Sequence, residues 1–144
     1  MHNKPHWLVP FDGSAQSTKA LALAVREIKD RLSPPELMVL NVQLPLSTDI
    51  TRFIDSKTLD GFHKKAGEEA LATAKAELEQ AGVVHSIHIQ VGSVAKTIVE
   101  FADSHHCSLI VMGTHGHSGM AGLLMGSVTT KVLHQSGIPV LLTK

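Results

Sequence analysis

Residues 109–127 read LIVMGTHGHSGMAGLLMGS, and this stretch decides the fold. The first four residues are apolar, as in a buried strand, and Gly113 begins a glycine-rich loop that leads to Ser127, where a helical pattern begins. Glycine lets backbone N–H groups approach a phosphate because no Cβ stands in the way. A helix N-terminus adds free N–H groups and a positive dipole end. The stretch therefore predicts a strand, a phosphate-binding loop and a helix, and with them a nucleotide site.

Strand and helix patterns alternate along the whole chain on either side of this stretch. Short apolar runs predict strands at residues 7–11, 37–42, 86–91, 108–112 and 138–143. Helical spacing predicts helices at residues 17–32, 59–81, 94–105 and 127–135, and the segment 44–57 is expected to form a loop. Such alternation implies parallel strands joined by right-handed helical crossovers. The predicted fold class is therefore α/β, with one domain over residues 1–144 that holds an open, doubly wound, five-stranded parallel sheet with helices on both faces.

The first two long helices show apolar stripes and end signals. The stripes are expected to consist of Leu21, Val25, Ile28 and Leu32 in the first helix and of Ala70, Ala74, Leu78 and Ala81 in the second. Ser14 and Ser17 are both candidate N-caps of the first helix. Gly82 is the expected stop of the second helix, because glycine adopts the left-handed conformation that often ends a helix.

Two turns are candidates for ligand contact. In open α/β sheets, ligands bind at the carboxyl ends of the strands, where the strand order reverses. The turn Asp12-Gly-Ser14 follows the first expected strand, and the loop from Gly113 follows the fourth. If these two strands are neighbours in the sheet, both turns face one cleft.

The composition indicates an ordinary globular protein and excludes some partners. The 144 residues are 43% hydrophobic and 18% charged, with 13 basic and 13 acidic residues. A net charge of zero argues against nucleic acid as the main partner, which requires a basic face. No apolar run approaches the roughly 20 residues that span a bilayer, and the first residues lack the apolar segment of a signal peptide. The single cysteine, Cys107, suits a reducing compartment, so we expect a cytoplasmic protein.

The loop matches one known phosphate-binding pattern. The P-loop and Gly-x-Gly-x-x-Gly motifs are absent from the sequence. The spacing Gly-x2-Gly-x9-Gly-Ser, formed by Gly113, Gly116, Gly126 and Ser127, resembles the nucleotide-binding signature of the universal stress protein family. Four further segments resemble that family in the same order along the chain, namely Leu8–Ser14, Val39–Val42, Val91–Ser93 and Gly137–Leu142.

This resemblance implies a strand order of 3-2-1-4-5 and membership of the branch of the family that binds ATP, with Mg²⁺. It implies that the nucleotide-binding residues are Pro10, Phe11, Asp12, Asn41, Val42, Met112, Gly113, His115, Gly116, His117, Gly126, Ser127, Val128 and Thr129. His117 stands where the family often has a basic residue, and Phe11 where a smaller aliphatic residue is common. It also implies a homodimer that forms through residues Ile138–Thr143.

Other functions remain open from the sequence. The glycine loop could be a connector without a ligand, and the protein could then act as a nucleotide-independent interaction module through its dimer surface. The chain could also be a weak ATPase or phosphorylate itself, with Ser127, Ser118 or Thr129 as acceptors. Asp12 is the only carboxylate that the sequence places in the cleft, and no arginine finger is evident. We therefore interpret the chain as a binding and signalling module, not a dedicated catalyst.

The histidines do not predict a structural metal site. His105 and His106 precede the fourth expected strand, whereas His115 and His117 follow it. A strand of about five residues separates the two pairs by roughly 16 Å. They cannot be ligands of one zinc ion, which needs converging donors.

Overall fold

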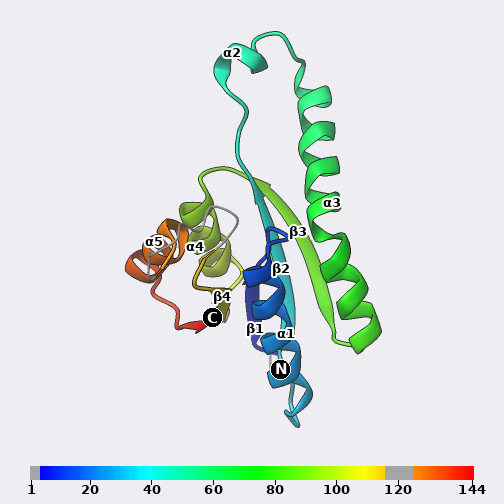
Figure 1. The fold of residues 1–144 in the computed structure, drawn as a ribbon, viewed down its shortest axis with the longest axis vertical. Helices are drawn as coiled ribbons and strands as arrows, with labels where there is room; N and C mark the ends of the chain where they lie inside the picture. Colours follow the sequence, from blue (N-terminus) through cyan, green and yellow to red (C-terminus); the bar gives the residue numbers. More distant parts are fainter. Residues whose placement is uncertain (1–3, 116–124) are drawn as a thin grey trace.

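The computed structural model describes residues 4–115 and 125–144 (Figure 1). The strands are β1 (His6–Pro10), β2 (Glu36–Gln43), β3 (His85–Val91), β4 (Cys107–Gly113) and β5 (Val140–Thr143). The helices are α1 (Ala15–Lys29), α2 (Thr48–Thr51), α3 (Ser56–Ala81), α4 (Val94–Ser104) and α5 (Ser127–Gln135). The predicted order of strands and helices is confirmed, with α2 as an additional short helix.

The five strands form one parallel sheet in the order β3-β2-β1-β4-β5. This order confirms the one implied by the family resemblance. β1 lies in the centre and pairs with both β2 and β4. The order therefore reverses between β1 and β4, and the turns that follow these two strands lie at the same edge of the sheet.

Helices cover both faces of the sheet, as predicted (Figure 1). α1 and α3 pack over one face on a core that includes Val9, Val39 and Val111. α4 and α5 pack over the other face on a core that includes Leu8 and Leu40. Neighbouring residues of a strand point to opposite faces, so each buried strand supplies both cores.

Side chains and a glycine fix the ends of α1 and α3. Ser14 is the N-cap of α1, and its hydroxyl accepts a hydrogen bond from the Ser17 N–H at 3.1 Å. Asp55 caps α3 in the same way, through the Thr58 N–H at 2.7 Å. Gly82 ends α3 in the left-handed conformation with φ of 69°. The predicted cap and stop are therefore confirmed, and Ser14 rather than Ser17 is the cap.

Several predicted boundaries were wrong. α1 ends at Lys29, so Leu32 lies beyond the helix and is fully exposed. The predicted apolar stripe of α3 was also wrong at Ala70, which is only partly buried. The buried face of the helix instead consists of His63, Gly67, Leu71, Ala74 and Leu78. β5 begins at Val140 rather than residue 138, because Pro139 has no N–H to donate to the ladder.

The segment predicted as a loop, 44–57, contains α2 and the start of α3. Both extend beyond the ends of the strands (Figure 1). This part of the chain carries exposed apolar side chains, including Ile50, Phe53 and Phe62. None of the helices in the described ranges combines the length and the apolar character that a membrane span requires.

Cys107 is predicted to be unreactive in the folded protein. Its side chain is buried beside Met38, and this burial raises the pKa of the thiol to about 11. This higher pKa leaves roughly 100-fold less thiolate, the reactive form, at pH 8. We expect a disulfide reagent to label the native protein far more slowly than the urea-unfolded protein. Equal rates in the two states would contradict this burial.

His88 is predicted to make stability depend on pH. It lies on β3 against Phe101 and His105 of the α4 end, with ring centroids 4.9 Å and 5.7 Å away. Burial lowers the pKa of His88, and the charge of His105 lowers it further. The unfolded chain therefore binds a proton more readily, so stability should fall as the pH drops below about 6.5.

Thermal unfolding between pH 8 and pH 5 measures this effect. His88→Phe keeps an aromatic ring but cannot titrate, so its melting temperature should fall less steeply towards pH 5. His106→Gln is the control, because His106 is exposed. An unchanged slope in His88→Phe would show that this histidine does not contribute.

Candidate functional site

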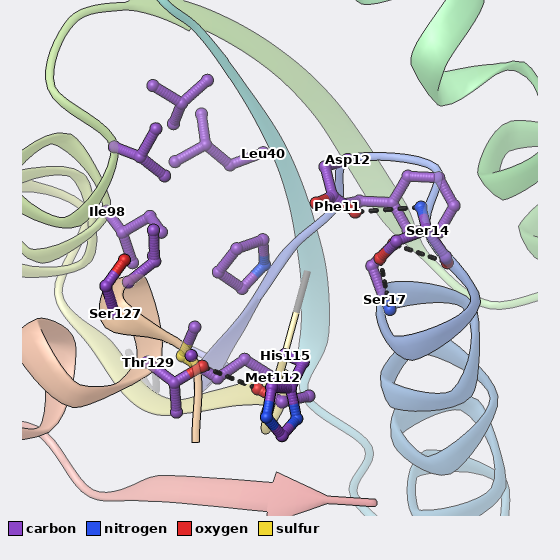
Figure 2. Close-up of a pocket in the computed structure, with 16 residues that line it drawn as sticks. Phe11, Asp12, Ser14, Ser17, Leu40, Ile98, Met112, His115, Ser127 and Thr129 are labelled. Carbon is purple, nitrogen blue, oxygen red and sulfur yellow. Dashed lines mark hydrogen bonds between the residues drawn. The ribbon is translucent and has the colours of Figure 1, made fainter. Parts of the chain in front are cut away.

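A pocket of about 220 Å³ lies at the carboxyl edge of the sheet, between the turn after β1 and the start of α5. Asp12 and Ser14 lie on one side, and Ser127, Thr129 and Ile98 lie on the other (Figure 2). The full lining consists of Pro10, Phe11, Asp12, Ser14, Ser17, Leu40, Val42, Val94, Ile98, Met112, Gly113, His115, Gly126, Ser127, Val128 and Thr129.

The first wall is the turn that joins β1 to α1. A carboxylate oxygen of Asp12 accepts a hydrogen bond from the Ser14 N–H at 2.9 Å (Figure 2). Gly13 between them has φ of 81°, a left-handed conformation that favours glycine. Ser14 then caps α1. The turn is therefore fixed locally, and Asp12 is both a turn residue and part of the pocket wall.

The second wall joins the end of β4 to the start of α5. The Gly126 N–H donates to the Thr114 carbonyl at 2.6 Å. The buried Thr129 hydroxyl donates to the Gly113 carbonyl at 2.9 Å (Figure 2). These two bonds hold the first turn of α5 against the end of β4, although nine residues of the loop between them, 116–124, lie outside the described ranges.

The N-terminus of α5 has no side-chain cap. Its N-cap residue is Gly126, which has no side chain, and among the described residues no side chain bonds the N–H groups of its first turn. Side chains cap α1, α2 and α3, whereas α4, like α5, has no side-chain cap hydrogen bond. The amides of Ser127, Val128 and Thr129 therefore begin a helix whose positive end borders the pocket. This is the geometry that binds anions at helix N-termini.

The remaining wall is apolar. Leu40 and Val42 come from β2, Val94 and Ile98 from α4, and Met112 from β4. No charged side chain comes from these three elements to the lining. An apolar chamber beside a helix N-terminus can hold a flat ring system that is attached to an anionic group.

Most of the predicted site residues line this pocket. Those that do are Pro10, Phe11, Asp12, Val42, Met112, Gly113, His115, Gly126, Ser127, Val128 and Thr129. Asn41 is described by the structure but is not part of the lining, because it points to the opposite face of β2 from Leu40 and Val42. The predictions for Gly116 and His117 lie outside the described residues.

Sequence reasoning missed Ser14, Ser17, Leu40, Val94 and Ile98 as lining residues. Two signals were present in the sequence. Residues 40 and 42 alternate onto one face of a strand, and residues 94 and 98 share one face of a helix. Neither signal says that β2 and α4 meet at this edge, which depends on the strand order.

Gly113 has a different role from the one its loop position suggests. A Cβ at this residue would lie 2.8 Å from the Gln16 Cβ and 3.1 Å from the Gln16 carbonyl oxygen. Glycine is therefore required here for the close approach of α1 to β4. Gly126 has φ of −72° and ψ of 160°, which other residues adopt readily.

The sequence profile described as the universal stress protein family matches residues 6–144. The chain belongs to this family. The universal stress protein YxiE from Bacillus subtilis is 33% identical over 152 residues, covering 100% of both chains. The solved structure of MJ0577, a universal stress protein from Methanocaldococcus jannaschii, is 29% identical, covers 97% of this chain and 95% of that chain, and has a TM-score of 0.80.

Two more distant family structures contain nucleotides. A universal stress protein in complex with cAMP is 24% identical, with a TM-score of 0.71 and coverage of 97% of both chains. A family member from Arabidopsis thaliana with AMP bound is 14% identical, with a TM-score of 0.68 and coverage of 97% of this chain and 91% of that chain. These likenesses show that this universal stress protein shares their fold.

Proposed function

We propose that this universal stress protein binds ATP in the described pocket and acts as a cytoplasmic stress-response and signalling module. The observation that carries the proposal is the uncapped N-terminus of α5 beside an apolar chamber. Family structures with cAMP and AMP support an adenine nucleotide as the ligand.

The pocket offers a suitable environment for each part of ATP. The apolar side chains of Val42, Ile98 and Met112 suit the adenine ring. Asp12 at the end of β1 suits the ribose hydroxyls or a metal ion. The amides of Ser127 and Thr129 at the start of α5 suit the phosphates.

Asp12 fits the proposed Mg²⁺. It is the only carboxylate in the pocket lining formed by the described residues. Mg²⁺ beside a nucleotide typically takes one or two protein carboxylates together with phosphate oxygens and waters. No group of three or more His, Cys, Asp or Glu side chains suited to a metal occurs within the described ranges. The ion would therefore arrive with the nucleotide, and it would neutralise phosphate charge.

Asp12→Asn is predicted to remove the benefit of Mg²⁺. Asparagine can still accept the Ser14 N–H, so the turn should persist. We expect ATP affinity without Mg²⁺ to change little, while the gain on adding Mg²⁺ should fall by roughly 3- to 10-fold. Calorimetric titration with and without Mg²⁺ measures this. An undiminished Mg²⁺ effect would place the ion away from Asp12.

Nucleotide analysis of the purified, denatured protein tests the function directly. We expect a stoichiometric adenine nucleotide, or calorimetric binding of ATP where none is retained. No nucleotide and no heat up to millimolar ATP would contradict the proposal and favour the nucleotide-independent interaction module. Transfer of the labelled γ-phosphate to the protein would instead favour an autophosphorylating enzyme.

A further inference from the structure

Asn41 lies on β2 behind the pocket, on the sheet face that α1 and α3 cover. It is 3% exposed, and both ends of its side-chain amide are hydrogen-bonded within the protein. Its Nδ2 donates to the Phe11 carbonyl at 2.9 Å. Its Oδ1 accepts from the Gln43 Nε2 at 2.6 Å. A chain of two hydrogen bonds therefore runs from Gln43 through Asn41 to the backbone of Phe11.

Both backbone polar groups of Phe11 are held by β2. The Phe11 N–H donates to the Leu40 carbonyl at 2.8 Å, and the Phe11 carbonyl accepts from Asn41. Phe11 directly follows β1 and directly precedes Asp12, so its peptide orientation sets where the pocket turn begins. Its ring is 2% exposed in the α1 and α3 core, which fixes the residue on the other side.

We propose that Asn41 and Gln43 are positioning residues, which place the Phe11–Asp12 turn for nucleotide binding without touching the nucleotide. This inference rests on the proposed function. The Phe11 carbonyl can only accept a hydrogen bond, so the NH₂ end of the Asn41 amide must face it. Gln43 selects that orientation, because its own NH₂ group occupies the oxygen end of Asn41.

Replacing Gln43 by glutamate reverses this selection. A carboxylate has no proton to donate, and it would accept from the Asn41 NH₂ group instead. The amide would then turn its oxygen towards the Phe11 carbonyl, where two acceptors repel each other. Gln43 is only partly buried and does not line the pocket, so its effect must pass through Asn41.

The test measures ATP affinity by calorimetry and folding by thermal unfolding. We expect Gln43→Glu to bind ATP roughly 5- to 10-fold more weakly than the wild type, which corresponds to one lost hydrogen bond. Gln43→Met also lacks the donor but cannot accept from the Asn41 NH₂ group, so the Phe11 carbonyl should still hold that group and binding should weaken less than in Gln43→Glu. This comparison separates loss of the donor from reversal of the Asn41 amide.

Gln90→Glu is the matched control. Gln90 is exposed on β3 and pairs in register with Val42, so it carries the same charge change beside the same strand end. It makes none of the hydrogen bonds in the Gln43–Asn41–Phe11 chain. We expect its ATP affinity to match that of the wild type. A double variant gives a second check, because Gln43→Glu should have no further effect in an Asn41→Ala background.

The carbonyl ¹³C shift of Phe11 in the nucleotide-free protein supplies a readout that does not depend on binding. We expect it to move in Gln43→Glu and to stay fixed in Gln90→Glu. An unchanged shift, or an affinity loss no larger than that of Gln90→Glu, would overturn the positioning role. A wild type that binds no ATP contradicts the proposed function instead, so the two failures are distinguishable.

Discussion

Gly126→Val is expected to weaken ATP binding by at least about 100-fold while leaving the fold intact. The valine Cβ and its methyl groups would occupy space at the α5 N-terminus, beside the amides proposed to hold the phosphates. The backbone at residue 126 is extended, which suits valine, and both of its backbone hydrogen bonds can persist. Calorimetric titration with ATP, together with a melting curve that shifts only a few degrees, measures this outcome.

Gly126→Ser sharpens the same prediction because two effects should have opposite signs. A serine at the N-cap can bond the first-turn amides of α5, which have no side-chain cap in the wild type. Stability should rise by a few tenths of a kcal/mol, while ATP affinity should fall because the cap competes for the same N–H groups. Tight ATP binding in both variants would show that the phosphates lie elsewhere.

Gly113→Ala provides the contrast within the same glycine pattern. The added Cβ would meet Gln16, including its backbone carbonyl oxygen at 3.1 Å. We expect a loss of about 1–3 kcal/mol in the free energy of unfolding, measured by urea denaturation. Gly113 thus allows α1 to pack closely against β4, whereas Gly126 leaves the first N–H groups of α5 without a side-chain cap. Wild-type stability in Gly113→Ala would remove that distinction.

Local patterns predicted the fold well because each core strand is a short apolar run and each helix has an apolar stripe. They failed where a tertiary contact decides the outcome. Leu32 fits the stripe of α1, but the helix ends at Lys29 before reaching it. In α3 the packing of Gly67 on Ile89 sets which face meets the sheet, and residue spacing alone could not reveal that contact.

The sequence predicted which positions of the chain form the candidate site. It did not predict which face of each strand or helix lines the pocket. Family resemblance selected the end of β2, but it did not distinguish Asn41, which points away, from Leu40, which lines the pocket. Val94 and Ile98 join the lining because α4 crosses the sheet near β2 and β4. That approach depends on contacts between distant segments, which one sequence does not display.

The protein is expected to form a homodimer through β5. This strand lies at one end of the sheet order, where it pairs with β4 on one side only. Proteins usually cover such an edge, and antiparallel pairing of β5 with its copy about a two-fold axis would do so. The Pro139 and Thr143 carbonyls accept hydrogen bonds from Ile110 and Thr114, so alternate backbone groups of β5 face β4 and the N–H groups of Val140 and Leu142 face the open edge. Sedimentation at micromolar concentration should therefore show a dimer.

Leu141→Lys is expected to shift the protein to monomer. Leu141 is 37% exposed, so a lysine can be accommodated in the monomer, whereas two lysines facing across the strand pair would repel each other. Leu142 is a poorer choice because it packs against the α4 and α5 core, and a charge there would damage the fold itself. Leu133→Lys is the matched control, because Leu133 is 38% exposed but lies on α5. If Leu141→Lys sediments as a dimer, or if Leu133→Lys alone becomes a monomer, the interface does not lie at β5.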